Sequence, residues 1–167
     1  MALDITDAGL ADVGIFGGSG LYRLLDDVTE VVVDTPYGPP SNPLHIAKVG
    51  DVRVAFLARH GAHHEFPAHT VNYRANVWVL KELAVQGVFS VATVGGVRGE
   101  FGPGTLAVPD QLIDYTHSRK GTFFEGAEAR VTHIDFTLPY STRLRTLLQE
   151  HYGLPSGEVQ LPPRRNY

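Results

Sequence analysis

The stretch that decides the fold is Val13 to Tyr22, VGIFGGSGLY, in which an apolar run leads directly into four small residues. Its Val, Ile and Phe predict a β-strand over 13–16 that is covered on both faces of a sheet. The glycines that follow let the backbone approach a ligand or another chain segment closely, because no Cβ stands in the way. The stretch therefore predicts a close contact at the end of a buried strand.

Apolar runs farther along the chain extend the sheet. Runs rich in β-branched residues and bounded by Gly, Pro or Asp predict four more strands, over 30–34, 52–58, 88–94 and 105–113. Pro109 interrupts the last run, which favours an edge strand or a bulge there. Residues 114–140 are predicted to form a long loop.

Two segments have the length and spacing of helices. The first, 72–87, carries Ala75, Val79 and Leu83 on one face and is expected to stop at Gly87. The second, 141–153, begins at a capping Ser141, ends at Gly153 and is expected to turn three leucines inward, namely Leu144, Leu147 and Leu148. Together these strands and helices predict an α/β fold with a mixed, largely buried central sheet flanked by helices, in a single domain over 1–167.

The composition excludes several classes of site. The chain has 14 Lys and Arg against 18 Asp and Glu, so its net charge of −4 argues against a nucleic-acid-binding surface. It has no cysteine, which excludes disulfides, zinc thiolates and thiol nucleophiles. No signal peptide opens the chain and no apolar run reaches the length of a membrane span, so a cytoplasmic protein is expected.

A dinucleotide-binding turn is the first alternative for the glycine stretch. Gly18 and Gly20 supply the first pair of such a fingerprint, and Asp34 ends the second predicted strand at about the right distance. Arg23 stands where the third glycine belongs, and no Gly-Lys-Ser/Thr follows to make a Walker loop. A nicotinamide-binding oxidoreductase therefore stays as a weaker alternative.

An oxyanion site is the second alternative. The run over 52–58 leads into Arg59 and His60, and the run over 88–94, which holds Thr93 near its end, leads into two glycines. Ligands of open α/β sheets bind beyond the carboxyl ends of the strands, so neighbouring strands would bring Ser19, Arg59, His60 and Thr93 together. Hydroxyls, an imidazole and a planar guanidinium suit a phosphate.

A metal site competes for the histidines. The segment HGAHHEFPAH holds four of them and one glutamate, namely His60, His63, His64, His69 and Glu65. A zinc hydrolase can draw on imidazoles this dense, but the spacing matches no helical His-Glu-x-x-His pair. We expect no metal.

Five motifs occur in a fixed order along the chain: VGIFGGSGLY, DTPYGPPS (34–41), ARHGAHH (58–64), VNYRANVWVLKELAV (71–85) and PGTLAVPDQLIDYT (103–116). On these motifs the chain resembles the methylthioadenosine phosphorylase and purine nucleoside phosphorylase family over about 13–139. The resemblance implies a glycosyltransferase of purine salvage, in which phosphate cleaves 5′-methylthioadenosine or a related nucleoside to the free purine and (5-methylthio)ribose 1-phosphate.

The resemblance also implies roles for individual residues. Phosphate would contact Ser19, Arg59, His60, Thr93 and the backbone N–H of Val94, with no metal or organic cofactor. His133 resembles a histidine that a neighbouring subunit of a trimer contributes to the sugar side of the pocket.

The family pattern continues beyond this chain, and the tail 154–167 matches none of it. The residue 94–98 segment, VGGVR, also carries an extra glycine and Arg98 compared with relatives. We therefore expect a truncated chain that holds the phosphate half of the site, lacks the purine-protonating aspartate and turns over slowly. A phosphate-binding remnant without catalysis is the alternative, and the preferred nucleoside stays open.

Overall fold

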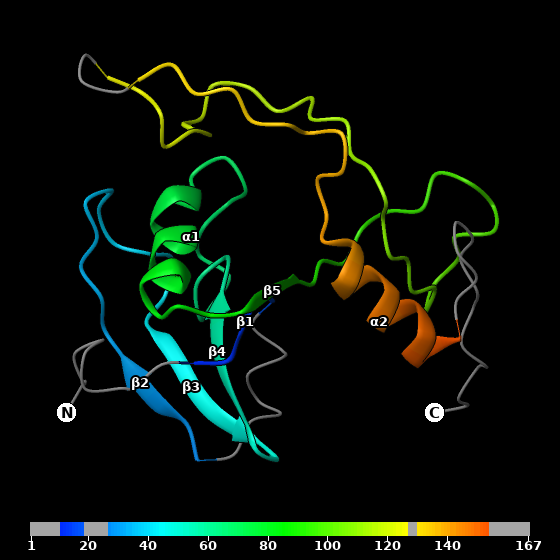
Figure 1. The fold of residues 1–167 in the computed structure, drawn as a ribbon, viewed down its shortest axis with the longest axis horizontal. Helices are drawn as coiled ribbons and strands as arrows, with labels where there is room; N and C mark the ends of the chain where they lie inside the picture. Colours follow the sequence, from blue (N-terminus) through cyan, green and yellow to red (C-terminus); the bar gives the residue numbers. More distant parts are fainter. Residues whose placement is uncertain (1–10, 19–26, 127–129, 154–167) are drawn as a thin grey trace. The chain divides into compact units, whose positions relative to one another are not determined.

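A computed structural model describes residues 11–18, 27–126 and 130–153 (Figure 1). The chain divides into two compact units, the first from Met1–Thr93 and His117–Glu128, the second from Val94–Thr116 and Ala129–Tyr167. Each unit is described by itself below. None of the described helices is long and apolar enough to cross a bilayer.

The first unit is built on a mixed five-stranded sheet with the strand order β2-β3-β4-β1-β5. Its strands are β1 (Val13–Gly17), β2 (Thr29–Val31), β3 (Leu44–Val49), β4 (Val52–Ala58) and β5 (Gly87–Ser90). β1 pairs in parallel with β4 on one side and β5 on the other, whereas β3 is antiparallel to both β2 and β4. The mixed α/β architecture predicted from the sequence is confirmed.

The parallel pairing places the carboxyl ends of β1, β4 and β5 at one edge of the sheet. Two backbone hydrogen bonds extend the ladders just past these ends: Arg59 N–H donates to Gly17 O at 3.0 Å, and Val91 N–H donates to Phe16 O at 2.8 Å. The residues that follow the three strands are therefore held side by side.

The predicted strands differ from the observed ones mainly at the edges of the sheet. β1 and β4 lie where they were predicted, whereas β2 and β5 are shorter than 30–34 and 88–94. β5 has one exposed face, with Val88 41% exposed, as befits a strand at the edge of the sheet. The strand predicted over 105–113 is also wrong, because no described strand pairs with this segment and Pro109 has no N–H to offer a ladder.

Strand β3 was not predicted from the sequence. The sequence feature that indicates it is the two-residue turn Gly50-Asp51 between the paired Val49 and Val52, a typical hairpin connection. Gly50 adopts φ +61°, a left-handed conformation that favours glycine. The β3–β4 hairpin follows from this turn.

Helix α1 (Tyr73–Glu82) covers the sheet with the face predicted for it. Asn72 caps the helix by accepting the N–H of Ala75, and Ala75, Val79 and Leu83 are fully buried. The helix ends at Glu82, with Leu83 as its C-cap, rather than at Gly87, because Ala84 adopts a positive φ of 52° and Gly87 begins β5. The predicted stop at Gly87 is therefore wrong by about one turn.

Gly14 is the point of closest approach between the helix and the sheet. A Cβ on Gly14 would lie 2.7 Å from Cδ1 of Leu80, a side chain of α1 that is 1% exposed. Leu80 belongs to a core cluster with residues of β2, β3 and β4, including Val31, Leu44 and Leu57. The first glycine of the deciding stretch is thus required by helix packing.

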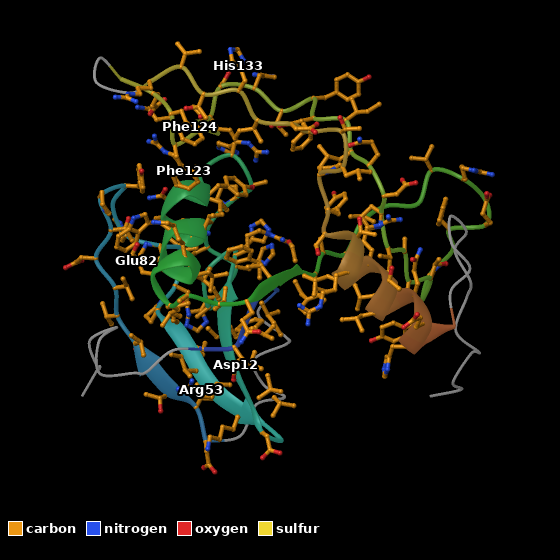
Figure 2. All side chains as sticks on the ribbon, viewed as in Figure 1. Asp12, Arg53, Glu82, Phe123, Phe124 and His133 are labelled. Carbon is orange, nitrogen blue, oxygen red and sulfur yellow. The ribbon has the colours of Figure 1, made fainter. Side chains whose placement is uncertain are left out.

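The segment 117–126 returns to the first unit through aromatic and charged contacts. The ring of Phe123 (Figure 2) meets the ring of Tyr37 edge-on with centroids 5.3 Å apart. The Arg74 guanidinium lies 4.9 Å from the Tyr37 ring centroid and pairs with the Glu125 carboxylate at 2.5 Å. Through these contacts the segment 117–126 packs against the loop after β2 and the start of α1.

Helix α2 (Thr142–Tyr152) lies in the second unit and has the predicted caps. Ser141 Oγ accepts the N–H of Leu144, and Gly153 adopts the left-handed conformation at φ 62°. None of its residues is buried, and Leu147 is 50% exposed, so the prediction of three inward leucines is wrong for the described structure. The single domain over 1–167 stays a prediction.

Substitution Gly14→Ala should lower the free energy of unfolding by about 1–3 kcal/mol, because the added methyl overlaps the buried Leu80. Gly121→Ala, in the same unit and with no heavy atom within 4 Å of the added Cβ, is the matched control. Denaturant unfolding measures both. Equal stability of the two variants would contradict this packing.

Candidate functional site

A pocket of about 330 Å³ lies at the carboxyl ends of β1, β4 and β5. It is lined by Gly18, Arg59, His60, His64, Val91, Ala92 and Thr93, all of them in the first unit. The structure therefore brings together three of the predicted site residues, Arg59, His60 and Thr93. This is the edge at which parallel sheets bind ligands.

Arg59 supplies the permanent charge of the pocket. Its backbone is held against β1, and its guanidinium reaches across to β5, with Nη1 3.3 Å from Ser90 Oγ and Nη2 3.4 Å from Val91 O. None of the described lining residues is acidic, so no carboxylate in the lining neutralises the guanidinium. The pocket is suited to an anion.

The His60 ring is fixed by the loop that follows it. Its Nδ1 lies 2.7 Å from Phe66 O, and because a carbonyl oxygen only accepts, Nδ1 carries a proton. In return, Phe66 N–H donates to His60 O at 3.0 Å. The ring thus has Nε2 left for a ligand.

His64 reaches the same pocket from the far side of this loop. Its ring is stacked on that of His60, with centroids 4.6 Å apart and planes inclined by 32°. The residue adopts φ +60°, and Gly61 adopts φ +82°. Sequence reasoning weighed His64 only as a metal ligand and missed it as a lining residue; the tight His-Gly-x-x-His turn was the signal.

Glu65 stabilises the loop between the two histidines. Its carboxylate accepts the N–H of His63 at 2.8 Å and lies so close to Gly61 that a Cβ there would overlap it. Hydrogen bonds from the backbone N–H groups of Glu65 and His63 lower the pKa of the Glu65 carboxyl, and His63 and His64 lower it further. The side chain is therefore ionised at neutral pH.

Of the other three predicted residues, one is not described and two lie in the second unit. Ser19 lies outside the described residues. Val94 and His133 belong to the second unit and are both exposed. Their roles stay predictions.

The strand order and the placement of the acidic and histidine side chains test the dinucleotide and metal alternatives. A dinucleotide fold needs the strand that ends at the acidic residue next to the strand that ends at the glycines. Here β3 and β4 separate β2, which precedes Asp34, from β1, so this alternative is wrong. Among residues 11–18, 27–126 and 130–153, no group of three or more His, Asp or Glu is placed to hold a metal ion.

Comparisons with known proteins match this chain to a family model and to individual relatives. A family model described as the phosphorylase superfamily matches residues 12–162. The chain is 51% identical to the purine nucleoside phosphorylase of Streptomyces coelicolor over 136 residues, which are 78% of this chain and 49% of that protein. It is 46% identical to the S-methyl-5′-thioadenosine phosphorylase of Thermococcus kodakarensis, over 87% of this chain and 57% of that protein.

The same likeness holds for solved structures. The crystal structure of a methylthioadenosine phosphorylase from an antarctic soil metagenomic library matches with a TM-score of 0.81 and 38% identity, over 87% of this chain and 50% of that one. The chain thus spans about half the length of the relatives it matches.

The hydrogen bond to Phe66 predicts that neutral His60 is the Nδ1–H tautomer. Two-dimensional ¹⁵N–¹H spectra that correlate ring nitrogens with ring protons should show it, with His60→Asn used to assign the signals. The signals of His69, which lies exposed in the same segment, serve as the internal reference for a solvent-exposed histidine. A predominant Nε2–H tautomer at His60 would contradict the described loop.

Proposed function

Because the chain belongs to the phosphorylase superfamily, we propose that its pocket holds inorganic phosphate for attack on the anomeric carbon of a purine nucleoside. In this reaction the bond from C1′ to the purine nitrogen breaks, a bond from C1′ to a phosphate oxygen forms, and the purine leaves with a proton. The names of the relatives support 5′-methylthioadenosine or a related purine nucleoside as the substrate.

The pocket chemistry fits the demands of this reaction. Cleavage of a glycosidic bond passes through an oxocarbenium-like state, so much of the catalysis lies in orienting the anionic nucleophile. The Arg59 guanidinium offers a planar fork to two phosphate oxygens, and the Thr93 hydroxyl and the His60 ring offer further hydrogen bonds.

One observation supports this proposal above the others. The residues that directly follow β4 and β5 line a single pocket with Gly18, which directly follows β1. A guanidinium with no acidic partner in that lining favours an oxyanion over a neutral or cationic ligand.

The remaining parts of the proposal rest on the family resemblance. Ser19 and the Val94 N–H are proposed as additional phosphate contacts, and His133 as a contribution from a neighbouring subunit of a trimer. Inorganic phosphate is the co-substrate, with no metal or organic cofactor. Such an enzyme would act in purine salvage in the cytoplasm.

Substitution Arg59→Gln should weaken phosphate binding by roughly 10- to 150-fold, because charge-assisted hydrogen bonds contribute about 1.5–3 kcal/mol. Isothermal titration calorimetry of the 167-residue chain with inorganic phosphate measures the change. Arg53→Gln is the matched control, since Arg53 lies near the start of β4, whereas Arg59 follows its end, and Arg53 pairs there with Asp12 (Figure 2). Equal affinity of the two variants would contradict a phosphate contact by Arg59.

Turnover is measured separately, as phosphate-dependent release of free adenine from 5′-methylthioadenosine or of hypoxanthine from inosine. Release that Arg59→Gln lowers and Arg53→Gln preserves would support phosphorolysis by this chain. Phosphate binding without release would favour the binding-only alternative.

A further inference from the structure

The described lining of the pocket holds one permanent positive charge, that of Arg59. Hydrogen phosphate at neutral pH and sulfate carry two negative charges, whereas Arg59 supplies one positive charge. Among the described lining residues, Gly18, Val91, Ala92 and Thr93 are neutral. The two imidazoles of His60 and His64 are the lining groups that can add a second positive charge by taking up a proton.

The geometry of the two rings leaves room for one added positive charge. With centroids 4.6 Å apart and planes inclined by 32°, two imidazolium rings would repel each other strongly, so only one of them carries a charge at a time. His60 keeps its Nδ1–H on Phe66 O in either state. The arrangement therefore accommodates one added charge.

Glu65 favours His64 as the residue that carries this charge. Its carboxylate is held inside the loop by the His63 N–H and lies against Gly61, outside the pocket lining. The pKa of this carboxyl is lowered mainly by the backbone N–H groups, with a smaller contribution from the charges of His63 and His64, but none from His60. Of the two histidines that line the pocket, His64 is therefore the one whose charge the Glu65 carboxylate meets.

We propose that His64 is the proton-linked cation of the oxyanion pocket, and that a dianion bound beside Arg59 is accompanied by uptake of a proton by the His60–His64 pair. This inference rests on the proposed function of the pocket. It assigns His64 a role in selecting the charge state of the complex, with Arg59 as the permanent cation and Glu65 as the counter-charge outside the pocket. Binding of the dianion then strengthens as the pH falls through the range in which imidazole titrates.

Sulfate is the appropriate probe, because it stays a dianion over the pH range in which phosphate itself changes charge. In water, a cation about 4 Å from a dianion gains about 2 kcal/mol, which is roughly 30-fold in affinity, so sulfate should bind on the order of 20- to 30-fold more weakly at pH 8.5 than at pH 5.5. At pH 7, binding of sulfate should be accompanied by net uptake of protons. Calorimetry of the 167-residue chain in buffers of different ionisation enthalpy measures this uptake.

Two matched variants separate His64 from its neighbours. His64→Asn removes the titratable ring and keeps the backbone, because asparagine tolerates the left-handed φ of 60° observed there. His63→Asn makes the same change at an exposed position in the same loop that does not line the pocket. We expect the first variant to lose most of the proton uptake and of the pH dependence, and the second to retain both.

The possible results separate this inference from the proposed function. Sulfate binding with the same proton uptake in wild type and His64→Asn, or with none in wild type, would overturn the role of His64 and leave the phosphate site standing. Failure of both sulfate and phosphate to bind at any pH between 5.5 and 8.5 would overturn the proposed function and this inference together.

Discussion

The parallel pairing of β1 with β4 on one side and β5 on the other is the constraint on which the site depends. Strands that run in the same direction end at the same edge, so Gly18, Arg59 and the residues after β5 are neighbours although they are far apart in the sequence. An antiparallel partner on either side of β1 would send one of these segments to the opposite edge of the sheet. The hydrogen bonds from Arg59 N–H to Gly17 O and from Val91 N–H to Phe16 O extend this constraint beyond the regular strands and into the pocket.

The glycine-rich stretch after Asp12 serves two different purposes within a few residues. Gly14 leaves room for the Leu80 side chain of α1, so the helix packs closely on the sheet, whereas Gly18 lies in the pocket lining. The buried side of the strand thus fixes the helix, and the strand's end presents backbone to the ligand site. A glycine pattern alone does not distinguish these uses, which is why it was compatible with a dinucleotide turn until the strand order was known.

The sequence predicted the centre of the fold better than its periphery. β1, β4 and the buried face of α1 were predicted because continuous apolar runs and helical spacing report burial directly. β3 was missed and the strand over 105–113 was predicted wrongly, since a strand exists only where another strand can pair with it, and pairing is a property of the whole sheet. In the site, Arg59, His60 and Thr93 could be predicted from their positions after apolar runs. His64 was missed, because its ring reaches the pocket through a positive φ, and the His-Gly-x-x-His turn was the one sequence signal of it.

The most direct test of the account is a crystal structure of the protein with inorganic phosphate bound. The account predicts the anion in the pocket after β1, β4 and β5, with the Arg59 guanidinium, the His60 ring and the Thr93 hydroxyl all within hydrogen-bond distance of its oxygens. A structure at saturating phosphate in which the anion binds elsewhere, or in which the Arg59 guanidinium turns away from this pocket, would contradict it.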